Sequence, residues 1–121
     1  MAQPIDNNPN VLYKGQPYTL EQTIYFDRWL RKLRDREGQL RISKRLVRLS
    51  NGHFGDCKSV GAGVHELRLF FGPGYRIYFI EYGGIVILLL AGGDKDSQAD
   101  DIVRAKLLAE EFFHGNKNDP L

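Results

Sequence analysis

Two arginines near the centre of the chain occupy positions from which they could act together. Arg76 follows a Gly-Pro-Gly turn in the stretch GPGYRIYF (72–79), where residues alternate as in a β-strand. The preceding stretch GVHELRLFF (63–71) alternates in the same way and contains Arg68. If the two strands are antiparallel, Arg68, Arg76 and Tyr78 lie on one face of the sheet. Guanidinium groups beside an aromatic ring form a surface that suits the phosphates and bases of a nucleic acid.

RNA cleavage is a reaction that these residue types could perform. RNA supplies its own nucleophile, the 2′-hydroxyl, so the protein needs no serine or cysteine for the attack. It must neutralise charge on the phosphorane and protonate the leaving 5′-oxygen, and Arg68 and Arg76 could act as fixed donors toward that charge. A general acid or base could come from four side chains: His65, Tyr78, Asp94 and Lys95.

Each of these residues also has a purely structural interpretation. Arg76 could pair with Glu66 or Glu81 across the sheet, because an unpaired buried charge is unfavourable. Lys95 could be an ordinary loop charge in the stretch GGDKDSQ. Tyr78 could either stack on a base or cover the sheet.

The basic residues are unevenly distributed. The segment 28–48 contains nine basic and two acidic side chains, a net charge of +7, although the whole chain carries only +2. The segment from 94 to the C-terminus contains seven acids and four bases, a net charge of −3. This asymmetry indicates either an anionic partner for the basic segment or a solvated helix face. The candidates for RNA binding on the predicted second helix are Arg41, Lys44, Arg45 and Arg48.

The predicted elements that would position these residues form one α+β domain, since a chain of 121 residues suits a single core. Apolar spacing predicts a short strand at 17–21, helices at 22–35 and 39–50 that form a hairpin, and a helix from about 97 to 115. Three strands at 63–71, 75–82 and 85–90 are joined by short turns and predict an antiparallel meander. We expect a loose N-terminal tail at 1–16, a domain at 17–115 and a short tail at 116–121.

The sequence contains few features that suggest a membrane, a metal or a cofactor. The longest apolar run, IVILLLA at 85–91, has the length of a strand, and the N-terminus lacks the pattern of a secretory signal. The single Cys57 and three separated histidines form no metal-ligand spacing. We therefore expect a cytoplasmic protein that needs neither a metal nor another cofactor.

Three blocks in order resemble a known family. The blocks FDRWLRKL, HFGDCKSVGAGVHELRLFFGPGYRIYF and LLLAGGDKDSQADDIVRA are similar to HigB-like addiction-module toxins of the RelE/ParE superfamily. The resemblance covers about residues 18–113. It implies a RelE/ParE-like fold with the element order predicted above.

The resemblance implies a bacterial type II toxin that cleaves mRNA, usually on the ribosome, and is neutralised by a HigA-like helix-turn-helix antitoxin. The superfamily's catalytic cations would correspond to Arg68 in ELR, Arg76 in GYR and Lys95 in GGDK. His65 is a further candidate for catalysis. Some ribosome-dependent members use a tyrosine in the last helix, whereas this chain has no tyrosine after Tyr82.

Two other functions are compatible with the same resemblance. ParE members share the fold but inhibit DNA gyrase without catalysis, and such a protein would not need the cluster of Arg68, Arg76 and Lys95. A degenerate toxin could act only in autorepression together with its antitoxin. Growth arrest and mRNA cleavage, measured beside gyrase inhibition, would separate these functions.

Overall fold

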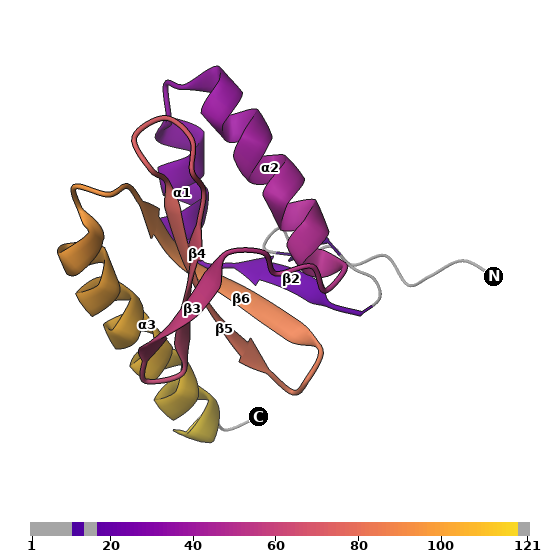
Figure 1. Ribbon diagram of the computed structural model, residues 1–121. Helices are drawn as coiled ribbons and strands as arrows, with labels where there is room; N and C mark the ends of the chain where they lie inside the picture. The colour runs from indigo at the N-terminus through magenta and orange to yellow at the C-terminus, as the bar shows by residue number, and fades with distance from the viewer. Residues whose placement is uncertain (1–10, 14–16, 119–121) are drawn as a thin grey trace.

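The computed structural model describes residues 11–13 and 17–118 of the chain (Figure 1). Other residues of the predicted N-terminal tail, 1–10 and 14–16, and of the C-terminal tail, 119–121, lie outside the described residues. The elements follow in the order β1 (Val11–Tyr13), β2 (Thr19–Gln22), α1 (Ile24–Lys32), α2 (Arg36–Ser50), β3 (Cys57–Gly61), β4 (Val64–Arg68), β5 (Arg76–Tyr82), β6 (Val86–Gly93) and α3 (Gln98–Asn118).

The strands form one mixed sheet of six strands in the order β1-β2-β6-β5-β4-β3. The predicted antiparallel meander is confirmed, because β5 pairs with β4 on one side and with β6 on the other. The predicted short strand is also confirmed as β2, which runs parallel to β6. The α+β class is therefore confirmed, with β5 and β6 in the interior of the sheet.

Helices cover both faces of this sheet (Figure 1). Apolar residues of α1 and α2 pack on one face, where Ile42 and Leu46 meet Leu67 and Ile77 in one buried cluster. The other face packs against α3 through a second cluster that includes Ala105. Arg68, Arg76 and their neighbours lie on this second face of the sheet, so α3 decides how much of that face solvent can reach.

The break between the first two helices lies earlier than the sequence suggested. The predicted ranges 22–35 and 39–50 place the break at 36–38, around Gly38, but α1 ends at Lys32 and α2 begins at Arg36. Asp35 is the N-cap of α2, and its carboxylate accepts a hydrogen bond from the Gly38 backbone N–H at 2.9 Å. This cap satisfies one of the free N–H groups of the first turn and so favours a helix start before the glycine.

The absence of a side chain at Gly38 serves packing instead. A Cβ there would lie 2.6 Å from Oδ2 of Asp35 and 2.8 Å from Cε2 of Tyr75. The hydroxyl of Tyr75 donates a hydrogen bond to Asp35 at 2.7 Å. Gly38 thus allows the residue before β5 to reach the N-terminus of α2.

Three further boundaries differ from the prediction. Residues 11–13 form β1 on the edge of the sheet, although we expected a tail there. Strand β3 was not predicted, because the exposed and half-buried residues of CKSVG have no strong apolar alternation. Helix α3 continues beyond Gly115 to Asn118.

None of the helices described between residues 17 and 118 is long and apolar enough to cross a membrane.

Candidate functional site

Arg68 and Arg76 are direct partners across the β4–β5 ladder. Antiparallel strands place the side chains of such a pair on the same face of the sheet and close together. The prediction that the two arginines lie side by side is therefore confirmed. Like charges in this position repel each other, so the site needs nearby anions to hold both guanidinium groups.

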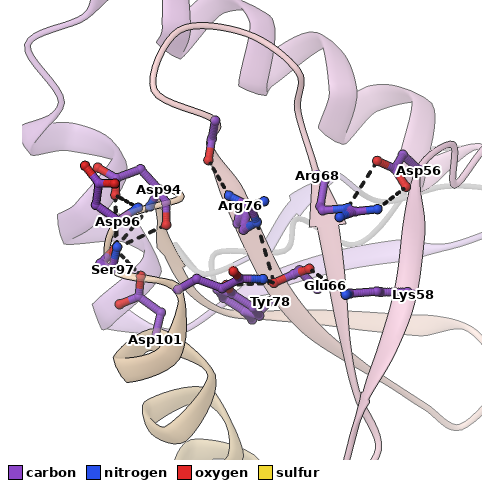
Figure 2. A network of polar contacts seen from close by, with 12 residues as sticks. Asp56, Lys58, Glu66, Arg68, Arg76, Tyr78, Asp94, Asp96, Ser97 and Asp101 are labelled. Atoms are coloured by element: carbon purple, nitrogen blue, oxygen red, sulfur yellow. Dashed lines mark hydrogen bonds and ion pairs between the residues drawn. The ribbon is translucent and has the colours of Figure 1, made fainter.

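Glu66 is the anion beside Arg76 (Figure 2). Nε of Arg76 lies 3.7 Å from Oε2 of Glu66, and Nη1 of Arg76 donates a hydrogen bond to the carbonyl oxygen of Gly74 at 3.1 Å. The side chain of Arg76 is 12% exposed. The structural interpretation in which Arg76 pairs with Glu66 is thus confirmed, and the two anchors fix the direction of the guanidinium.

The carboxylate of Glu66 is fully buried and has partners from three elements. Oε2 accepts hydrogen bonds from the hydroxyl of Tyr78 at 3.0 Å and from Nε2 of Gln98 on α3 at 2.8 Å. Oε1 lies 4.0 Å from Nζ of Lys58 on β3. A buried carboxylate needs such partners, because desolvation of an unpaired charge is strongly unfavourable. The network therefore connects Arg76 to the start of α3.

Of the two alternatives that the sequence left open for Tyr78, the structure supports the one in which it covers the sheet, and the role in RNA binding is wrong. The side chain is fully buried in the cluster beneath α3 and presents no free ring face on which a base could stack. Burial first and then the hydrogen bond to Glu66 raise the pKa of Tyr78 above its ordinary value. Tyr78 therefore stays protonated and acts as a donor within the network. Alternation alone could place the residue on a face but could not show that α3 covers it.

Arg68 pairs with a different carboxylate. Its Nε lies 3.2 Å from Oδ2 of Asp56, in the loop before β3, and its side chain is 31% exposed (Figure 2). Arg68 is therefore more accessible than Arg76 and lies at the open end of the pair. A half-exposed ion pair of this kind is weak enough to rearrange around a ligand.

Arg45 supports this loop, so its guanidinium is not free for the RNA contact that the sequence predicted. Its Nη1 donates to the carbonyl oxygen of Arg68 at 2.8 Å, and its Nη2 lies 3.2 Å from the carbonyl oxygens of Phe54 and Asp56. Burial lowers the pKa of Arg45, with a further contribution from Arg48. The planar guanidinium thus holds three backbone carbonyl groups at once, a role that lysine could not perform.

Lys95 lies beside the turn that precedes Arg76. Its backbone N–H donates to the carbonyl oxygen of Pro73 at 3.4 Å. A Cβ at Gly74 would lie 3.4 Å from Cβ of Lys95 and 3.5 Å from Nη1 of Arg76, so the side chains of both residues begin or pass near this glycine. The side chain of Lys95 is exposed. The structure therefore brings Lys95 into the same neighbourhood as the arginine pair.

Asp94 has a local structural role at the start of α3. Its Oδ1 accepts hydrogen bonds from the backbone N–H groups of Asp96 at 2.9 Å and of Ser97 at 3.1 Å. Such a carboxylate stabilises the turn into the helix. The turn holds Lys95, which follows Asp94 directly, in its position beside Gly74.

His65 does not join these cations. It pairs with Phe79 across the ladder, and its ring stacks on Phe79 with 5.3 Å between the centroids. Phe79 belongs to the cluster under α1 and α2, whereas Arg68 and Arg76 lie on the α3 face. The expectation that His65 could act with Arg76 is therefore wrong, because the sheet separates them.

A second cationic surface lies between α2 and the loop after β4. Arg41, Lys44 and Arg48 are exposed, as the sequence predicted. An open hollow of about 230 Å³ is lined by Arg41, Lys44, Arg45, Arg48, Leu69, Phe70 and Phe71. Sequence reasoning missed Phe70, which is 83% exposed. The alternation of the segment 63–71 was a usable signal, since it places Phe70 on the same side as Arg68.

Within residues 11–13 and 17–118, no group of three or more His, Cys, Asp or Glu side chains is arranged to hold a metal ion. The side chains at the arginine pair supply fixed cationic donors, one exposed amine and a buried carboxylate. These groups suit the binding of a phosphate or another anion.

Comparison with known proteins identifies a relative of this chain. No family model matches the chain. An uncharacterized protein of Haemophilus influenzae is 47% identical over 93 residues, a region that covers 77% of this chain and 94% of that protein. At this identity and coverage, the chain belongs to the same family as the Haemophilus influenzae protein.

Proposed function

We propose that the protein is the toxin of a type II toxin–antitoxin system and acts in the cytoplasm as a metal-independent endoribonuclease on mRNA, on the ribosome. The observation that carries the proposal is the cross-strand pair of Arg68 and Arg76 with Lys95 beside the adjoining turn. The three positions are those to which the resemblance to HigB-like toxins assigns catalytic cations. We also propose that the fold is RelE/ParE-like, since the order β2-α1-α2-β4-β5-β6-α3 agrees with that superfamily.

In the proposed reaction, the 2′-oxygen of a nucleotide attacks the adjacent phosphorus and the bond from phosphorus to the 5′-oxygen breaks. The products are a 2′,3′-cyclic phosphate and a 5′-hydroxyl end. Arg76 stabilises the charge that develops on the phosphorane, and its anchors at Glu66 and Gly74 keep it in place before the reaction begins. Arg68 contacts the same phosphate from the exposed side of the pair.

Lys95 is the group that we assign to proton transfer. His65 lies on the opposite face of the sheet, Tyr78 is buried, and the carboxylate of Asp94 accepts two backbone N–H groups. Lys95 is exposed, its Cβ lies near Gly74, and we assign to its ammonium the donation of a proton to the leaving 5′-oxygen, while the 2′-hydroxyl releases its proton to solvent.

The neutralising partner in this proposal is a HigA-like helix-turn-helix antitoxin. The exposed cations of α1, among them Arg28, Arg31 and Lys32, suit an acidic segment of such a partner. Co-purification of the products of neighbouring genes tests this part of the proposal. A neighbour that neither binds the protein nor restores growth would contradict it.

Inhibition of DNA gyrase is the second candidate, and one observation favours it. Two of the four acid–base candidates, His65 and Tyr78, are not available beside the arginine pair, and a third, Asp94, is engaged by two backbone N–H groups. A protein that inhibits gyrase by binding would need no acid or base at all. A degenerate toxin that acts only in autorepression would show neither activity.

The experiment that separates these functions is brief induction without antitoxin. We expect growth arrest and new mRNA 5′ ends in primer extension, with 5′-hydroxyl chemistry and no gyrase-dependent DNA cleavage. Gyrase-dependent DNA cleavage without new mRNA ends would contradict the ribonuclease function and support inhibition of gyrase. Normal growth at confirmed soluble expression would overturn both.

A further inference from the structure

Phe70 presents an almost free aromatic ring within a cationic surface. Its neighbours in the sequence are turned inward, since Leu69 is buried and Phe71 packs partly against the α1–α2 core. Phe70 itself is 83% exposed, and the Arg68 guanidinium lies 5.8 Å from the centroid of its ring. Single exposed apolar residues are common, but a ring held beside a guanidinium has both parts of a nucleobase-stacking site.

The cations of α2 extend this surface away from Phe70. Arg41, Lys44, Arg45 and Arg48 are spaced at i, i+3, i+4 and i+7, which places them on one face of the helix. Together they line the hollow of about 230 Å³ with Leu69, Phe70 and Phe71, and no carboxylate is among these lining residues. The stripe is about 10 Å long, roughly the rise of three stacked nucleotides.

The four cations do not all offer the same contact. Arg45 is occupied by three backbone carbonyl groups and supports the loop, as described above. Arg41 lies over the ring of Phe71 at 4.1 Å and pairs with Glu37 at 3.3 Å, a solvent-exposed pair that contributes little. Lys44 and Arg48 are exposed and are the most accessible contacts for a phosphate.

We propose that this hollow binds single-stranded RNA, with a base stacked on Phe70 and backbone phosphates bound by Lys44, Arg48 and Arg41. The inference rests on the proposed ribonuclease function for the choice of RNA. Arg68 connects the two surfaces, since its guanidinium lies 5.8 Å from the centroid of the Phe70 ring and it is the cross-strand partner of Arg76. An RNA strand bound in this hollow would therefore pass close to Arg68, with the nucleotides next to the cleaved bond held beside the arginine pair.

RNA suits this hollow better than an acidic peptide does. A peptide helix that binds in a groove needs apolar pockets for side chains at i, i+4 and i+7, whereas the apolar part here is a single protruding ring and its two neighbours. Every nucleobase has a flat face that can stack on such a ring, and the phosphates match the adjacent cations. The expected recognition is thus tolerant of sequence.

Binding of a fluorescent oligouridylate of about eight nucleotides, within the usual site size, tests the proposal by anisotropy. We expect Phe70→Ala in the full-length protein to weaken binding by roughly 5- to 150-fold, the usual range for loss of one stacking partner. Phe70→Tyr should bind as the wild type does. Phe113→Ala is the matched control, because Phe113 is also exposed but lies on α3, and it should leave binding unchanged.

Salt dependence tests the phosphate contacts separately. Lys44→Ala should reduce the slope of log K against log salt by about 0.7, the contribution of one phosphate contact in a single strand. Arg104→Ala removes an exposed cation on α3 and should leave the slope unchanged. Thermal melting of every variant confirms that the binding measurements concern folded protein.

Equal RNA affinity of folded Phe70→Ala and wild type would overturn the proposal. It would also be overturned if Phe70→Ala weakened binding of a polyglutamate peptide and left RNA binding unchanged, because the groove would then be a protein site. The result is independent of catalysis. RNA binding that depends on Phe70, without cleavage, would contradict the proposed nuclease and support RNA binding at the hollow. Cleavage without binding that depends on Phe70 would support the nuclease and contradict RNA binding at the hollow.

Discussion

Arg68 and Arg76 face each other across two antiparallel strands, and each is neutralised by a different carboxylate, Asp56 and Glu66. The two carboxylates differ in environment, because Glu66 is fully buried and Asp56 is partly exposed. The pair therefore has a fixed member, Arg76, and an adaptable member, Arg68. This division of roles leads to the first prediction.

Arg76→Ala should reduce mRNA cleavage by about 10²–10³-fold, the typical loss for one preorganised donor. It should also lower the melting temperature, because it removes a partner of the buried Glu66. The double variant Arg76→Ala with Glu66→Gln removes the uncompensated charge and should recover stability without recovering cleavage. Arg76→Lys should restore cleavage only in part, since lysine lacks the planar fork of the guanidinium.

Cleavage and thermal unfolding are to be measured on the same preparations of these variants. A catalytic role predicts that the two quantities separate in the double variant. If cleavage instead follows the amount of folded protein in every variant, Arg76 has only a structural role. Full cleavage by folded Arg76→Ala would exclude the catalytic assignment.

Tyr78→Phe should destabilise the protein by about 1–3 kcal/mol, the usual effect of leaving a buried acceptor without one of its donors. The hydroxyl of Tyr78 is one of two donors to Oε2 of Glu66, and the phenyl ring alone would fill the same space. Urea unfolding measures the change. Tyr82→Phe, which removes the hydrogen bond from the half-buried Tyr82 to Glu21, is the control and should have a smaller effect. Equal losses of unfolding free energy in the two variants would show that the burial of Glu66 does not increase the effect of losing its donor.

Gly38→Ala should lower the melting temperature although alanine is the better helix former. The new methyl group would meet the Asp35 carboxylate and the Tyr75 ring at less than normal contact distance. Gly115→Ala in α3 is the matched control, since nothing lies within 4 Å of a Cβ there. It should stabilise by roughly 0.5–1 kcal/mol, the ordinary difference in helix propensity. Stabilisation by both substitutions would contradict the packing role of Gly38.

Asp35 should make folding stability sensitive to acid. The hydrogen bond from the Gly38 N–H, and then that from Tyr75, hold the pKa of Asp35 below its ordinary range. The unfolded chain therefore binds this proton more readily, so the stabilisation is present above the ordinary aspartate pKa and is lost as the pH falls through the lowered value. Thermal melts across this acid range should show a shallower decline for Asp35→Asn than for the wild type. Identical declines would contradict the assignment.

The hydrogen bond between Tyr75 and Asp35 also affects the pKa of Tyr75. Burial, together with the hydrogen bond to Asp35, raises the pKa of Tyr75 to about 12. The phenol thus remains a donor to the cap of α2 over the whole neutral range. The acid dependence described for Asp35 can therefore be attributed to the carboxylate and not to Tyr75.

Local patterns determined most of the fold and part of the site. Alternation over the segments 63–71 and 75–82, together with the continuous apolar run at 85–90, was sufficient to predict β4, β5 and β6, because their apolar positions face buried layers. Alternation also placed Arg68 and Arg76 on the same face of the sheet, and the register of the two strands makes them direct partners. The edge strands β1 and β3 were missed because their pairing depends on the rest of the sheet and not on their own composition.

Tertiary structure decided which of these residues solvent can reach. Sequence periodicity assigns a side chain to a face, but only the packing of α3 buries Tyr78 and Glu66, and only the loop before β3 turns Arg45 inward. Phe70 has the opposite outcome, since no element covers it among the described residues. Burial depends on contacts between elements distant in sequence, and these contacts determine whether a charged or aromatic residue serves the core or a ligand.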